Sequence, residues 1–207
     1  MKYTTTRGRR VLTFVAGATS ALGLAATAAL TASSAGAAVA NAQATSFTFK
    51  LVPSAGIAAC LPHAGGKVTI TPGRLNDTMQ VSIHGMPRNT GFDLFVIEQP
   101  AKPFGISWYQ TDIQAGRHGD GTATVRGIFD KETFTVSPDP AQTIAPTHQY
   151  HLGLWFNNPR TPFNLGCEPG APNPIVTPFN GEQHAGIQVL NTAQFPVNAG
   201  PLSHVHR

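Results

Sequence analysis

Residues 78–98 read TMQVSIHGMPRNTGFDLFVIE, and this stretch carries the clearest indication of fold in the chain. Met79, Val81 and Ile83 alternate with polar residues, which is the period of a strand with one buried face. Turn-forming residues follow, and a second apolar run extends from Phe92 to Ile97. The stretch therefore predicts two strands joined by a compact turn, the unit from which antiparallel sandwiches are assembled.

Seven further segments resemble these two strands in length and composition, and turn residues separate them. They are 46–52, 67–71, 104–113, 122–129, 132–136, 148–156 and 186–190. The pair Asp120-Gly121 is a strong hairpin signal between two of them. No amphipathic helical stretch of three turns appears after residue 40. Eight or nine short strands predict an all-β fold with a closed or two-layer antiparallel structure.

The first forty residues have the pattern of an export signal. Four basic residues precede an apolar stretch at 11–32, and A-x-A patterns end at positions 37, 40 and 44. We expect cleavage after Ala40, which gives a signal peptide at 1–40. The alternative is an uncleaved membrane anchor, because the apolar stretch is nearly long enough to span a bilayer. Its weak hydrophobicity and the A-x-A sites favour removal. Arg9-Arg10 also resembles a twin-arginine signal.

Removal of the signal changes the charge of the chain. The full sequence has 14 Lys plus Arg against 10 Asp plus Glu. The expected signal contains four of the basic residues (Lys2, Arg7, Arg9 and Arg10) and no acidic one, so ten of each sign remain. A near-neutral mature chain gives no electrostatic reason to expect nucleic acid or an anionic membrane as a partner.

Residues 41–207 are enough for one domain with its own core. We expect a single domain with a loose tail before Thr45 and a loop and frayed end after Asn191. Cys60 and Cys167 both lie in this part, and in an oxidising compartment two cysteines of one domain usually pair. Such a bridge stabilises the fold by about 4 to 5 kcal/mol in the chain-entropy model. The alternative is two free buried thiols.

Two resemblances to known proteins follow from particular motifs. The segment GMPRNTGFDLFV, Gly85 to Val96, is similar to the L-x-P-x-T-x-Y-x-L corner of fibronectin type III and related sandwich domains. This resemblance implies an immunoglobulin-like β-sandwich. Phe92 stands where those domains carry Tyr, so the hydrogen bond from the corner hydroxyl is missing here.

Several longer blocks are similar to a group of exported actinobacterial proteins. Besides the signal, they are PFGISWYQTDI (103–113), YHLGLWFN (150–157), VTPFNGE (176–182) and AGIQVLNT (185–192). The resemblance covers most of the mature chain and implies an exported single-domain protein. The group has no assigned activity, so no catalytic residue is implied.

Histidine is the one enriched reactive residue. The eight are His63, His84, His118, His148, His151, His184, His204 and His206. A metal site needs several of them to converge on one point. His204 and His206 share one side of an extended chain and are weak candidates for copper or zinc, whereas His148 and His151 point to opposite faces of a strand. We therefore expect no metal and no cofactor.

Hydrolase signatures are absent, since the chain has neither a G-x-S-x-G elbow nor an H-E-x-x-H motif. Asp93 and Glu98 are five positions apart on a predicted strand and face opposite sides, so we expect no catalytic residues. An alternative is a small secreted enzyme or metal-binding protein with a histidine-centred site, using His118, His148 or His151. Three imidazoles or carboxylates within about 4 Å of a common point would favour it.

Aromatic side chains offer a ligand surface instead. His151 and Trp155 lie opposite the apolar stripe of their strand, on the side that meets solvent in a sandwich. Trp108 and Tyr109 are consecutive, so one of them points away from the core. Exposed Trp and Tyr form a platform for sugar rings or for another protein. The alternative is that the long loop 157–178 folds over these side chains and buries them.

These observations predict an exported, non-catalytic binding or surface-associated protein. We expect a monomeric, disulfide-linked β-sandwich, secreted or held at the cell surface, with no membrane span after signal cleavage. Its expected ligand is extracellular, such as a glycan or another protein, and binds at Trp108, Tyr109, His151 and Trp155.

Overall fold

The computed structural model describes residues 45–129, 148–178 and 184–205. These residues form ten strands and a few short helical turns. The strands are β1 (Phe47–Pro53), β2 (Gly65–Thr71), β3 (Asp77–His84), β4 (Gly91–Ile97), β5 (Ser107–Gln114), β6 (Gly121–Gly127), β7 (His151–Phe156), β8 (Thr177–Pro178), β9 (His184–Ala185) and β10 (Gln188–Asn191). The helical turns are α1 (Ile57–Cys60), α2 (Arg160–Asn164), η1 (Val197–Ala199) and η2 (Pro201–His204).

Every predicted strand within the described residues is confirmed, with small shifts at its ends. The predicted strand at 132–136 and the expected signal peptide at 1–40 lie outside the described residues. No helix of the described residues is long and apolar enough to cross a membrane.

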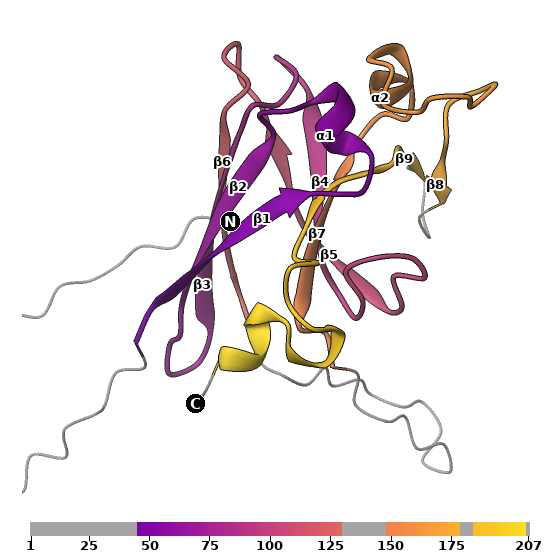
Figure 1. Ribbon diagram of the computed structural model, residues 1–207. Helices are drawn as coiled ribbons and strands as arrows, with labels where there is room; N and C mark the ends of the chain where they lie inside the picture. Colours follow the sequence, from indigo (N-terminus) through magenta and orange to yellow (C-terminus); the bar gives the residue numbers. More distant parts are fainter. Residues whose placement is uncertain (1–44, 130–147, 179–183, 206–207) are drawn as a thin grey trace, which may run out of the picture. The chain divides into compact units, whose positions relative to one another are not determined.

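Eight strands form one antiparallel sheet in the order β5-β4-β7-β10-β1-β2-β3-β6 (Figure 1). β1 joins the two halves of this sheet, because Phe47–Leu51 pair with β2 while Val52 and Pro53 pair with β10. The edge strands β5 and β6 come into contact without pairing, so the sheet is nearly closed into a barrel. The antiparallel all-β class is therefore confirmed. The two separate sheets of an immunoglobulin-like sandwich are not confirmed.

Two turns carry the chain from one half of the sheet to the other. The turn 85–90 leads from β3, which pairs with β2 and β6, to β4, which pairs with β5 and β7. The turn 115–120 leads from β5 to β6, and it closes with a hydrogen bond from the Gly116 amide to the Asp120 carbonyl at 2.9 Å. The hairpin predicted at Asp120-Gly121 is thus present as a turn but wrong as a strand pairing.

The two crossing turns hold each other at one end of the sheet. The Met86 amide donates to the Gly119 carbonyl at 3.1 Å, and the Ala115 amide donates to the Thr90 carbonyl at 2.9 Å. Gly119 has a φ of 80°, and a Cβ there would overlap the Met86 carbonyl. Only glycine fits this close backbone approach.

The apolar side chains inside the sheet form the main core. Met79, Val81 and Ile83 of β3 are buried, as their alternation predicts, and Phe92 packs against Phe156 with ring centroids 5.2 Å apart. A second, smaller cluster lies on the outer face of β4 and β7. It contains Phe95, Ile97, Trp155 and Ala185, with Phe104 packed against it, and we call it the outer cluster.

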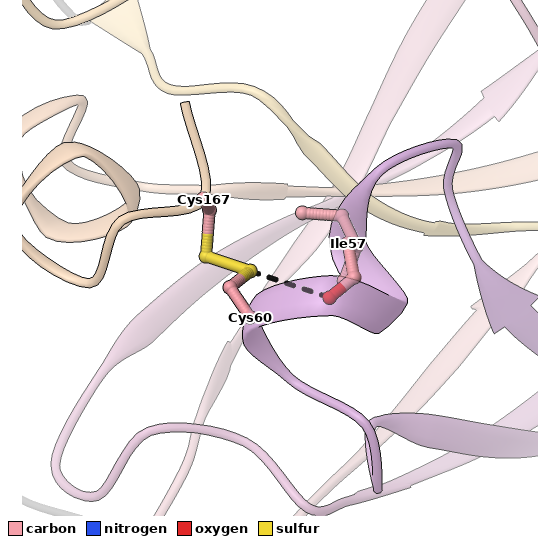
Figure 2. Close-up of a disulfide and its surroundings, with 3 residues drawn as sticks. All are labelled: Ile57, Cys60 and Cys167. Carbon is pink, nitrogen blue, oxygen red and sulfur yellow. Dashed lines mark hydrogen bonds between the residues drawn. A yellow bond between two sulfur atoms is a disulfide. The ribbon is translucent and has the colours of Figure 1, made fainter. Parts of the chain in front are cut away.

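The predicted disulfide between Cys60 and Cys167 is confirmed, with Cα atoms 5.2 Å apart (Figure 2). It ties the end of α1 to the segment that follows α2. The Cys60 sulfur lies 3.3 Å from the Ile57 carbonyl oxygen. This is a contact rather than a hydrogen bond, since a bridged sulfur carries no hydrogen. The bridge joins two segments that have no ladder between them and are 107 positions apart in sequence.

Residues 192–205 pack against the sheet instead of fraying. Leu202 and Val205 are buried, and the Leu202 amide donates to the Tyr150 carbonyl at 3.1 Å. The prediction of a frayed end after Asn191 is therefore wrong for these residues. Leu202 and Val205 cover an end of the core from a segment of short helical turns. Such a segment has no hydrophobic period that could be recognised in the sequence.

Candidate functional site

The four residues of the expected ligand surface separate into a buried pair on β7 and an exposed pair on β5. His151 is 0% exposed and Trp155 is 2% exposed, so the prediction that they face solvent is wrong. Both do lie on the outer face of β7, as the alternation predicts. The rings of Phe95 and Phe104 stack edge-on against Trp155 at 5.4 and 4.9 Å and cover it.

The cover over β7 comes from two loops. Glu98 and Gln99 fold the 98–106 segment back, because their amides donate to the carbonyls of Ile106 and Phe104 at 3.0 Å. The second part is the β8–β9 ribbon at the end of the 157–178 loop, and it contributes Ala185. Burial by the long loop was the alternative reading of the sequence, and it is confirmed in part; the 98–106 loop was not foreseen.

His151 is held as a buried neutral imidazole. Its Nδ1 lies 2.9 Å from the Thr192 hydroxyl and its Nε2 lies 3.1 Å from the Val197 carbonyl. The carbonyl can only accept, so Nε2 carries the hydrogen and Nδ1 accepts from the hydroxyl. Burial lowers the pKa of His151 below its ordinary 6.5, outweighing the carbonyl contacts that raise it. The residue ties β7 to the C-terminal segment and has no free nitrogen for a ligand.

Trp108 and Tyr109 are about half exposed, at 49% and 54%, and the nearby Ile106 is 48% exposed. Among the strands that the structure describes, β5 lies at an edge of the sheet and pairs only with β4. Tyr109 lies opposite Phe95 and Trp108 opposite Val96, so the two aromatic rings leave opposite faces of the strand. We refer to Ile106, Trp108 and Tyr109 together as the aromatic edge.

A bulge in β5 brings Tyr109 and Asp112 to the same face. The register of β5 against β4 shifts between Thr111 and Tyr109, so Gln110 has no partner across the ladder. On a regular strand, side chains three positions apart point to opposite faces, and the extra residue removes this difference. The Tyr109 hydroxyl consequently donates to Asp112 Oδ1 at 2.9 Å.

Asp112 faces a second carboxyl group, that of Asp93 on β4. The two are direct neighbours in the antiparallel ladder, and Asp93 is only 2% exposed. Burial raises the pKa of Asp93 from 3.8 to about 7, helped by the hydrogen bond and the charge of Asp112 and opposed by the Asn157 amide. Asn157 Nδ2 donates to Asp93 Oδ1 at 3.1 Å. Near neutral pH Asp93 is therefore partly protonated, which reduces the repulsion between the two carboxyl groups.

The same carboxyl groups act on Tyr109. Burial and the neighbouring Asp112 raise the pKa of Tyr109 to about 12, so its hydroxyl stays protonated and keeps donating to Asp112. Sequence reasoning missed the pairing of Asp93 with Asp112. The two residues are 19 positions apart, and only the register of β5 against β4 makes them neighbours.

The histidines of the described residues lie apart. Tyr150 stacks on His148 at 5.2 Å, His118 Nε2 accepts from Arg117 Nε at 2.8 Å, and His204 packs near Phe47. His206 lies outside the described residues. Within residues 45–129, 148–178 and 184–205, no three His, Cys, Asp or Glu side chains come together as metal ligands would.

A shallow groove of about 470 Å³ crosses the cover of the outer cluster. Lys102, Pro103 and Phe104 of the 98–106 loop form one side of the groove. Residues 176–178, which include β8, form the other side. Of these residues, Phe104 also packs against Trp155 in the outer cluster.

No protein-family model matches the chain, and no curated protein sequence is similar to it.

Proposed function

We propose that the protein is an exported, non-catalytic binding protein whose ligand contacts the aromatic edge. The observation that carries this proposal is the exposure of Trp108 and Tyr109 on the edge strand β5 and of Ile106 just before it. Tryptophan and tyrosine contribute most to binding where they are rigidly presented, since few rotatable bonds are frozen on contact. Tyr109 is presented rigidly, because Phe95 supports its ring at 5.7 Å and Asp112 fixes its hydroxyl.

The contrast between the aromatic edge and the outer cluster supports a functional role for the exposed side chains of the aromatic edge. The 98–106 loop places Phe104 over the buried Trp155 and then leaves Ile106, Trp108 and Tyr109 about half exposed within the next five positions. Clustered exposed apolar side chains are costly unless a partner covers them. The fold can therefore bury an aromatic side chain in this region, yet it leaves the side chains of Ile106, Trp108 and Tyr109 about half exposed.

Export and family remain parts of the same proposal. The disulfide is compatible with an extracellular protein, and the expected signal peptide supports export. The resemblance to exported actinobacterial proteins supports the same location. An immunoglobulin-like relationship is supported by the corner motif at 85–96 and by the two four-stranded halves, whose inward side chains share one core.

The proposal is tested with the processed chain on a glycan array and a panel of immobilised cell-surface proteins. A ligand found in either screen should lose at least about tenfold in affinity with Trp108→Ala, the usual cost of removing a central aromatic contact. Leu75→Ala, another exposed apolar residue in the β2–β3 turn, is the matched control. Unchanged affinity of both Trp108→Ala and Tyr109→Ala would contradict the proposal.

A further inference from the structure

Two carboxyl groups meet at the aromatic edge without a positive charge. Asp93 and Asp112 stand directly opposite each other on β4 and β5, an arrangement that destabilises a sheet when both are charged. Both receive hydrogen bonds from neutral groups: the Asn157 amide donates to Asp93 and the Tyr109 hydroxyl donates to Asp112. Neither carboxylate forms an ion pair with a Lys, Arg or His in the described part of the chain.

The surroundings of Asp93 leave one of its oxygens without a partner. Oδ2 is buried and accepts no hydrogen bond, although the side chain as a whole is 98% buried. β5 contributes Asp112 and Tyr109 to its surroundings, and β7 contributes Trp155, which does not titrate. Asn157, just past the end of β7, is bonded to the other oxygen. A buried carboxylate in this setting lacks the counter-charge that such groups require.

Asp112 and Tyr109 are the exposed residues beside Asp93. Asp112 is exposed, and the ring beside it is half exposed. A carboxylate next to an aromatic face suits a guanidinium or an ammonium group, because the carboxylate forms a charge-assisted hydrogen bond and the ring attracts the cation. We propose that Tyr109 and Asp112, backed by Asp93, form a site for an organic cation carried by the ligand. This inference rests on the proposed binding role of the aromatic edge.

A cation at this site favours the ionised form of Asp93 and so replaces the proton that Asp93 holds. Since burial and Asp112 hold the pKa of Asp93 at about 7, binding below that pH releases a proton. Affinity then rises with pH by up to about tenfold per unit until about pH 7, and levels off above it.

The experiment compares arginine amide with citrulline amide, in which a neutral urea group of nearly the same shape replaces the guanidinium, by NMR titration of the processed protein. We expect arginine amide to shift the amide signals of Asp93, Tyr109 and Asp112, with an affinity at least tenfold above that of citrulline amide. Asp112→Asn should abolish this preference and its pH dependence. Asp120→Asn, which removes an exposed carboxylate in the β5–β6 turn, should change neither.

Two additional arms identify the source of the cation. Tighter binding of Gly-Arg-Gly amide than of arginine amide indicates a side chain of a protein partner, and the reverse indicates a free amine. Displacement of arginine amide by an equal concentration of calcium would overturn the inference in favour of a metal site. Equal affinity for the arginine and citrulline probes would also overturn it, while a ligand that still depends on Trp108 would leave the proposed function standing.

Discussion

β5 and β7 flank the same strand, β4, and both carry a tryptophan, yet their surroundings differ completely. All six residues of β7 are buried, on both faces of the sheet. On β5 only Ile113 is buried, and the first three residues are exposed. The difference comes from what lies outside the sheet: the 98–106 loop and the β8–β9 ribbon cover β7, and nothing in the described residues covers the start of β5. Exposure in this fold is therefore decided by loops rather than by the strand pattern.

The largest expected effect comes from releasing the loop that leads to the β8–β9 ribbon. Replacement of both Cys60 and Cys167 by Ser should lower the free energy of unfolding by about 4 to 5 kcal/mol, because the bridge closes a loop of more than a hundred residues. Urea denaturation followed by fluorescence measures this. In a Trp108→Phe background the tryptophan fluorescence comes from Trp155. Acrylamide should quench this fluorescence more strongly when both cysteines are replaced. A loss below about 1 kcal/mol would show that the cover holds β7 without the bridge.

Trp155→Ala should cost about 3 to 5 kcal/mol of stability, since it leaves a cavity under Phe95 and Phe104. Trp108→Ala, its counterpart on β5, should cost less than about 1 kcal/mol because half of its surface is already in water. Thermal and urea unfolding of the two variants measure the difference. Trp155→Phe is the control for ring packing and should lie between them. Equal losses would remove the distinction between the two strands.

Asp93→Asn tests the carboxyl pair that joins β4 to β5. The pKa of Asp93 in the folded protein, about 7, lies above its ordinary 3.8, so its ionisation destabilises the fold as pH rises from 3.8 to 7. Over this range, ionisation of Asp93 should lower the free energy of unfolding of the wild type by roughly 2 kcal/mol. This figure is reduced for solvent screening, because the neighbouring Asp112 is exposed. The variant should lack this loss and be the more stable protein at pH 8. An unchanged pH profile of unfolding in the variant would contradict the raised pKa of Asp93.

The titration of His151 should have the smallest effect on stability, and its effect should change with pH in the direction opposite to that of Asp93. Its pKa in the folded protein lies below 6.5, so the unfolded chain takes up protons first and stability falls as pH decreases below 6.5. In the Asp93→Asn background, melting temperatures at pH 7 and pH 5.5 isolate this contribution, which should be about 1 kcal/mol. A His151→Gln variant that loses the acid slope but still folds would assign it. A slope that persists in that variant would place its origin elsewhere.

Much of the secondary structure follows from local patterns. The strands at 78–84 and 92–97 were predicted from alternation and from an apolar run, and the cysteine pair from the compartment and the count. The pairing of strands was not predictable in the same way. β5 and β6 are joined by a short turn with Asp-Gly, yet each pairs with a different neighbour, because the two crossing turns hydrogen-bond to each other instead of closing a hairpin.

The candidate site shows the same division. Trp108 and Tyr109 could be identified from the sequence, because consecutive residues on a strand cannot both enter the core. Asp93 and Asp112 could not be paired, since their contact depends on the register of β5 and on the bulge at Gln110. His151 and Trp155 were placed on the correct face of β7, but the loops that bury them have no period to recognise.

The sequence by itself determined the strands, the turns and the two cysteines that join, because alternation, turn propensity and thiol chemistry act over a few residues or depend on residue type alone. The tertiary structure decided which strands are neighbours, which aromatic residues meet water and which carboxyl groups face each other. These properties depend on register and on the path of loops through space, and both are set by packing between segments that are distant in the chain.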